Sequence, residues 1–125
     1  MIEKLLYVSF GGAIGAVLRH SMISISHRLI NSAIPIGTIA VNVVGSLAIG
    51  FLWGYFEKIS APANLRMFVF IGVLGGFTTF SSFSIETLNL FRGGEYRLAL
   101  INILASNLLA ISAVFIGFYL ADLLN

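Results

Sequence analysis

The chain has 125 residues, of which 58% are hydrophobic and only 10% are charged, and its mean hydropathy is +1.01. Soluble domains balance these classes differently, so the composition indicates an integral membrane protein. The seven Lys and Arg residues are scattered and form no basic stripe, so a nucleic acid is not an expected partner. Cysteine is absent, which excludes disulfides and thiolate metal sites.

Four apolar runs predict four transmembrane helices, because each run is near the roughly 20 residues that cross a bilayer. Their approximate bounds are 5–23, 36–56, 67–91 and 98–121. The connections are short and polar and leave no room for a second domain, so we expect one transmembrane domain over residues 1–125. The first run also resembles the core of a cleaved signal peptide, but Arg19 and His20 are poor flanks for a cleavage site.

The loop charges do not favour one orientation in the membrane. Four spans place both termini on the same side. The basic loop residues then divide equally: Lys4, Lys58 and Arg66 lie on that side, and Arg28, Arg92 and Arg97 lie on the other. Such a balance allows two interpretations. Either the chain has one preferred orientation that so few loop charges do not reveal, or it inserts both ways and pairs as an antiparallel, dual-topology homodimer.

The small size also favours a dimer. Four helices cannot easily surround a polar path and still present an apolar outer face. Glycine pairs of the GxxxG type are available for close helix packing. They are Gly11 with Gly15, Gly50 with Gly54, and Gly72 with Gly76. Packing within one chain explains each pair as well as a dimer face does.

The third span contains a polar interruption, GGFTTFSSFS at residues 75–84. Its adjacent glycines favour an opening near Gly75, so we expect the third helix to be broken near its middle. Backbone carbonyls that lose their helical N–H partners need a new partner in hydrocarbon, and a bound cation can be that partner. The alternative is a plain kink in which Ser and Thr hydroxyls bond to the freed backbone groups. Phe80 and Phe83 follow among hydroxyls, and the positive edges of their rings can accept an anion.

Polar residues in two other spans recur at helical spacing. Thr38, Asn42 and Ser46 are four residues apart and share one face of the second span, and Asn102 and Ser106 repeat the spacing in the fourth. Single hydroxyls often bond to their own backbone, whereas an asparagine amide must bond across helices or line a wet path. These donors carry no positive charge that would trap an anion, so together they predict a path for a small, hard one.

Two charged residues lie within the spans. Arg19 follows fourteen charge-free residues, which places it about 21 Å from the start of its helix. Its side chain either snorkels to the interface or faces a water-filled vestibule. Glu86, in the third span, is a capping or pairing partner or, alternatively, a proton carrier.

The stretch at 75–83, Asn42 in VNVVGS and Arg19 in GAVLRH resemble the Fluc (CrcB) fluoride channel family, and the resemblance covers the whole chain. It implies a fluoride-selective channel, not an enzyme, that lowers cytoplasmic fluoride by passive export across the cell inner membrane. It also implies an antiparallel homodimer with two pores and a structural sodium ion at its centre.

The resemblance also implies roles for individual residues. The backbone carbonyls of Gly75 and Thr78 would bind the sodium ion, and Arg19 would lie in a vestibule. Positions that would face fluoride are Phe80, Phe83, Asn42, the hydroxyls of Thr79, Ser81 and Ser82, and Asn102 and Ser106 in the fourth span.

Other functions fit the residues less well. A small four-helix multidrug/proton antiporter needs an acidic residue within its first span, and the only acid inside a span is Glu86, in the third. An assembly subunit of a larger membrane complex leaves the phenylalanine and hydroxyl cluster unexplained. An enzyme is not expected, because the sequence has no nucleophile with a base, no carboxylate pair and no metal-ligand cluster.

Overall fold

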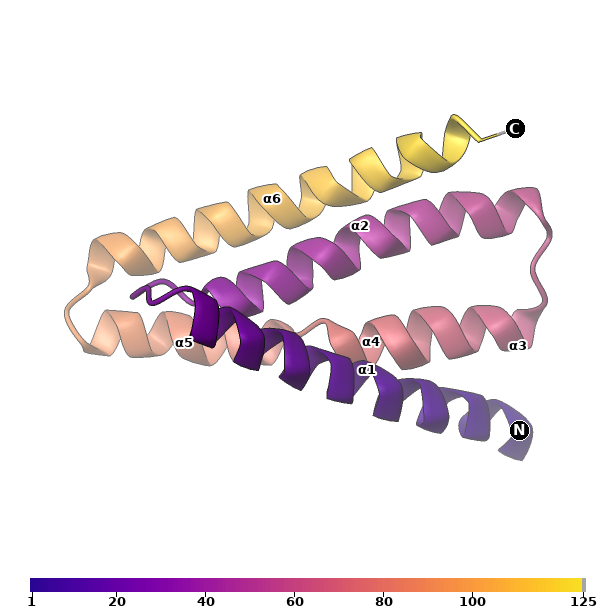
Figure 1. Ribbon diagram of the computed structural model, residues 1–125, viewed down its shortest axis with the longest axis horizontal. Helices are drawn as coiled ribbons and strands as arrows, with labels where there is room; N and C mark the ends of the chain where they lie inside the picture. The colour runs from indigo at the N-terminus through magenta and orange to yellow at the C-terminus, as the bar shows by residue number, and fades with distance from the viewer. Residues whose placement is uncertain (125) are drawn as a thin grey trace.

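The computed structural model describes residues 1–124 and consists of helices (Figure 1). Its elements are α1 (Ile2–Leu29), α2 (Ile36–Lys58), α3 (Ala63–Arg66), the π-helix η1 (Met67–Leu74), α4 (Gly75–Phe77), α5 (Phe80–Arg92) and α6 (Tyr96–Asp122). The segments from α3 to α5 follow one another along a single broken span. Four helical stretches are long and apolar enough to cross a membrane, which confirms the predicted all-α membrane fold.

The chain runs up and down, so α1 begins and α6 finishes at the same end of the molecule (Figure 1). Both termini and the connection between α2 and α3 lie at one end, whereas the connections from α1 to α2 and from α5 to α6 lie at the other. The basic loop residues therefore divide between the two ends as predicted, three at each.

Glycines allow α1 to cross the third span at close range. A methyl group on Gly72 would lie 2.8 Å from the Cα of Gly11, and one on Gly76 would lie 2.7 Å from the carbonyl oxygen of Gly12. Glycine also allows α2 and α6 to pack closely, because a methyl on Gly50 would collide with the backbone of Val114. The predicted glycine pairs thus serve packing within the chain.

The third helix is broken near its middle, as predicted, but the glycines do not form the break. Gly75 keeps helical angles (φ −63°, ψ −38°). The chain is extended at Thr78 (φ −85°, ψ 158°) and Thr79 (φ −152°, ψ 122°), and α5 begins at the next residue. The opening therefore lies three positions beyond Gly75, at two β-branched residues that favour extended backbone. Gly76 provides close packing against α1 instead, whereas a methyl on Gly75 would meet only its own span, 3.6 Å from the Phe70 carbonyl oxygen.

Candidate functional site

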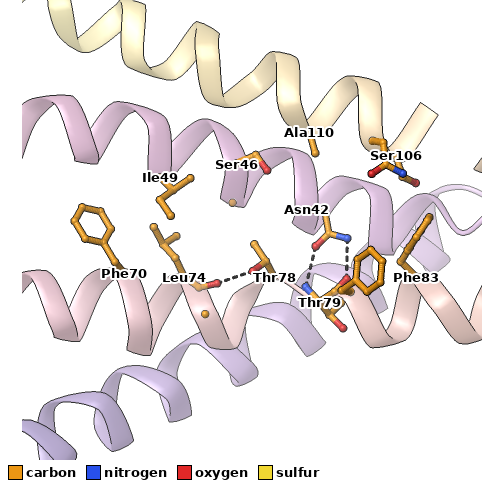
Figure 2. A pocket seen from close by; sticks show the side chains of 14 residues that line it. Asn42, Ser46, Ile49, Phe70, Leu74, Thr78, Thr79, Phe83, Ser106 and Ala110 are labelled. Carbon is orange, nitrogen blue, oxygen red and sulfur yellow. Dashed lines mark hydrogen bonds between the residues drawn. The ribbon is translucent and has the colours of Figure 1, made fainter. Parts of the chain in front are cut away.

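A pocket of about 390 Å³ lies at the break, between α2, the third span and α6 (Figure 2). None of its fourteen lining residues carries a formal charge. The pocket brings together seven of the predicted site residues: Asn42, Gly75, Thr78, Thr79, Phe80, Phe83 and Ser106. The other predicted residues lie beside or behind this set.

Asn42 binds the break directly. Its Nδ2 donates to the carbonyl oxygen of Thr79 at 2.9 Å, and the Thr79 backbone N–H donates to Asn42 Oδ1 at 2.8 Å (Figure 2). An amide side chain has one donor group and one acceptor, and an extended residue presents its N–H and C=O on the same side. The asparagine therefore pairs with Thr79 as a neighbouring β-strand would.

The side chain of Thr79 caps the second half of the span. Its Oγ1 accepts the backbone N–H of Ser82 at 3.1 Å and lies 3.3 Å from the hydroxyl of Ser81. This is the N-cap arrangement that satisfies an exposed N–H at a helix start. On the other side of the break, Thr78 Oγ1 donates to the carbonyl of Leu74 at 2.9 Å. Ser81 and Ser82 thus contact the cap and are not among the pocket-lining residues.

The two phenylalanines after the break lie one turn apart on α5. Their ring centroids are 5.2 Å apart and their planes meet at 50°. Phe83 is 8% exposed and packs within the chain, whereas Phe80 is 74% exposed. Of these two rings, Phe83 is therefore a fixed part of the pocket wall, and Phe80 lies on the open surface of the protomer.

Asn102 lies behind the pocket in a small hydrogen-bond network. It is fully buried, and its Nδ2 donates to Thr87 Oγ1 at 2.9 Å. Ser106, which lines the pocket, donates to Asn102 Oδ1 at 3.2 Å. Asn102 therefore orients a pocket residue and joins α6 to α5, and its own side chain does not line the pocket.

Thr38 and Glu86 pair away from the pocket. Thr38 is buried, and its Oγ1 donates to Glu86 Oε1 at 2.6 Å. Glu86 also borders a separate cavity of about 300 Å³ near the loops, together with His27 and Glu95. Of the roles considered for Glu86, the structure thus shows a pairing partner.

Arg19 reaches the break from α1. Its Nη1 lies 3.5 Å from the carbonyl oxygen of Thr78, which is the outer limit of a hydrogen bond. The half-buried side chain therefore points toward the break and not along the helix toward the interface.

Sequence reasoning missed two residues that shape the site. A methyl group on Gly45 would collide with Cγ2 of Thr78, so only glycine leaves space for that side chain. Thr87 links α5 to Asn102. The sequence could have indicated Gly45, because it follows Asn42 by three residues and shares its helix face. Nothing in the sequence distinguishes Thr87 from any other threonine near the end of a span.

These features define a class: a small four-helix membrane protein with an uncharged pocket at a broken helix, the kind of opening at which membrane transport proteins bind ions. The family described as "CrcB-like protein, Camphor Resistance (CrcB)" matches residues 6–118. The chain belongs to this CrcB family.

Relatives of this chain match it over nearly their full length. A protein from Parabacteroides distasonis named "Fluoride-specific ion channel FluC" is 46% identical over 117 residues, covering 94% of this chain and 91% of the relative. Proteins of the same name from Magnetococcus marinus (41% identity, 97% and 99% covered) and Elusimicrobium minutum (41%, 99% and 98%) are similar as well.

Proposed function

We propose that this protein is a fluoride-specific ion channel that exports fluoride passively. The relatives with that name cover nearly the whole chain. The structural observation that carries the proposal is the uncharged pocket at the break, which amide and hydroxyl groups line together with Phe80 and Phe83.

The pocket has the chemistry that a dehydrating fluoride ion needs. Fluoride is small and holds water strongly, so hydrogen-bond donors must replace that water inside the membrane. One N–H of Asn42 is bonded to Thr79, which leaves its second N–H available, and among residues 1–124 the Ser46 hydroxyl has no hydrogen-bond partner. The ring edges of Phe80 and Phe83 add weak positive potential. A full cation in the pocket would hold the ion, whereas these neutral groups let it pass.

A reversal-potential measurement tests selectivity. With mostly fluoride on one side of a planar bilayer and mostly chloride on the other, and some of both anions on each side, the current should reverse close to the equilibrium potential of fluoride. Reversal near zero would mean that the two anions pass equally and would contradict the proposal. A dependence on a proton gradient would favour the multidrug/proton antiporter, although the acid within a span, Glu86, is already paired with Thr38.

We also propose that two copies pair as an antiparallel, dual-topology homodimer in the cell inner membrane, each copy forming a single transmembrane domain. The equal division of loop charges supports this arrangement. So does the open side of the pocket, where Phe80 is 74% exposed and a second copy could complete the wall. A single cysteine introduced as Glu95→Cys, in the turn before α6, should be labelled from both sides of intact membranes. Labelling from one side alone would contradict dual topology.

A structural sodium ion completes the proposal. The backbone oxygens at the break fit such an ion, because the carbonyl oxygens of Gly75 and Thr78 accept no backbone N–H within residues 1–124. Uncharged oxygen ligands of an unwound helix suit sodium. When bound, the ion would give these carbonyl oxygens the electrostatic partner that they lost where the helix opens. Of the proposed anion-pathway residues, five line the pocket and four lie beside or behind it: Asn42, Phe80, Phe83, Thr79 and Ser106 in the first group, and Ser81, Ser82, Asn102 and Thr38 in the second. Arg19 is the proposed vestibule residue.

A further inference from the structure

The backbone N–H groups around the break have new partners. In an uninterrupted α-helix, the carbonyl of residue i accepts the N–H of residue i+4. The Gly75 carbonyl would accept from Thr79, and the Thr78 carbonyl from Ser82. In the structure, the Thr79 N–H donates instead to Asn42 Oδ1 at 2.8 Å, and the Ser82 N–H donates to Thr79 Oγ1 at 3.1 Å.

Two side chains thus divert the two N–H groups that would otherwise occupy these carbonyls. The residue just before the break still makes the α-helical bond, because the Thr78 N–H donates to the Leu74 carbonyl at 3.0 Å. The first missing bond is the one that Asn42 replaces. The nearest charged donor, Arg19 Nη1, lies 3.5 Å from the Thr78 oxygen, too far for a strong hydrogen bond.

Asn42 also opposes reclosure of the helix. Its second hydrogen bond, from Nδ2 to the Thr79 carbonyl at 2.9 Å, holds that residue extended. Gly45, one turn along the same helix, leaves the space that Thr78 occupies. Reforming the bond from Thr79 to Gly75 would break both asparagine hydrogen bonds and move Thr78 out of this space.

We propose that Asn42 and Thr79 are positioning residues for the cation site: their side chains take the N–H groups that would close the helix, and so keep the Gly75 and Thr78 carbonyls free to bind a cation. This inference rests on the sodium site of the proposed function. It gives Asn42 a second role beside anion passage, and it predicts that changing this residue weakens sodium binding.

Sodium-dependent thermal unfolding of the full chain in detergent tests the proposal without measuring flux. The melting temperature is followed while sodium replaces N-methylglucamine at constant ionic strength. Asn42→Leu keeps the approximate size but loses both hydrogen bonds, so its half-maximal stabilisation should require roughly tenfold more sodium than the unmodified chain. Ser46→Ala is the matched control, since Ser46 lies one turn away on α2 and lines the same pocket; its sodium response should be unchanged.

The Thr79 variants provide a second, independent test. Thr79→Val removes the oxygen that accepts the Ser82 N–H and should also weaken the sodium response. Thr79→Ser keeps that oxygen and should retain the sodium response of the unmodified chain. These variants decide the matter if Asn42→Leu does not fold. An unmodified chain that sodium does not stabilise would overturn the sodium site and this inference with it. A normal sodium response in Asn42→Leu or Thr79→Val, with the unmodified chain responding, would overturn the inference alone.

Discussion

Thr38 on α2 donates a 2.6 Å hydrogen bond to Glu86 on α5, and this bond joins two helices within the membrane. Glu86 is half-buried and Thr38 is 3% exposed. A carboxylate in this position is costly unless a donor satisfies it. The pair therefore contributes to holding the second half of the broken span against α2.

Thr38→Val should destabilise the protein because it removes the donor and keeps the shape. Hydrogen bonds to charged groups contribute about 1.5–3 kcal/mol, so a loss of this size is expected in chemical unfolding. Ser84→Ala serves as the control, since Ser84 is exposed and bonds only to its own helix. Equal stability of the two variants would show that the bond between the helices contributes little.

Replacing Phe80 or Phe83 should slow fluoride flux. Phe80→Ile and Phe83→Ile each remove a ring edge, and we expect roughly a tenfold decrease, equivalent to about 1.4 kcal/mol in the barrier. Phe83→Ile should also lower the stability of the protomer, because Phe83 is buried. Phe80→Ile should leave the stability of the protomer unchanged, because Phe80 is exposed. Phe115→Ile, at a residue 64% exposed on α6, is the control. Unchanged flux in both pocket variants would remove the role of the rings.

Two adjacent glycines on α1 should respond oppositely to alanine. A methyl on Gly11 would lie 2.5 Å from the carbonyl oxygen of Phe68, whereas one on Gly12 would meet nothing within 4 Å. Gly11→Ala should therefore cost about 1–3 kcal/mol through overpacking. Gly12→Ala should be neutral or slightly stabilising, because alanine favours helix. Comparing their melting temperatures checks the crossing of α1 and the third span, and a neutral Gly11→Ala would contradict it.

Lys58 should hold the C-terminal turn of α6. Its Nζ donates to the carbonyls of Ala121 and Leu124, each at 2.6 Å, and lies 3.9 Å from Asp122 Oδ1. A cation at a helix C-terminus satisfies free carbonyls. Lys58→Met should therefore speed amide hydrogen exchange in the last turn. The same substitution at Lys4, which is exposed on α1, should leave that exchange unchanged. Equal exchange rates in the two variants would exclude the cap.

Much of the architecture could be predicted, because apolar length determines which segments can span a bilayer. The break was predictable from the polar stretch at 75–84, but its position was not. That position depends on Asn42, which is distant in sequence, and two hydrogen bonds to Thr79 select the residue that leaves the helix. Adjacent glycines suggested an opening at Gly75, but Gly75 stays helical and Gly76 packs against α1.

The pocket could be predicted only in part for the same reason. Helical spacing correctly grouped Asn42 with Ser46, since residues four apart share a face. Spacing could not distinguish Ser106, which lines the pocket, from Asn102, which lies behind it bonded to Thr87. Burial of this kind depends on how α5 and α6 pack, and a single helix face does not reveal it.

Anion efflux from liposomes that contain the purified protein tests the central claim most directly. Fluoride and chloride are loaded as potassium salts in separate vesicles, and release is followed with ion-selective electrodes. Valinomycin lets potassium leave with the anion, so that no membrane potential builds up to stop the efflux. We predict rapid fluoride release without a proton gradient and chloride release no faster than from protein-free vesicles. Equal release of the two anions, or no fluoride release, would contradict the assignment.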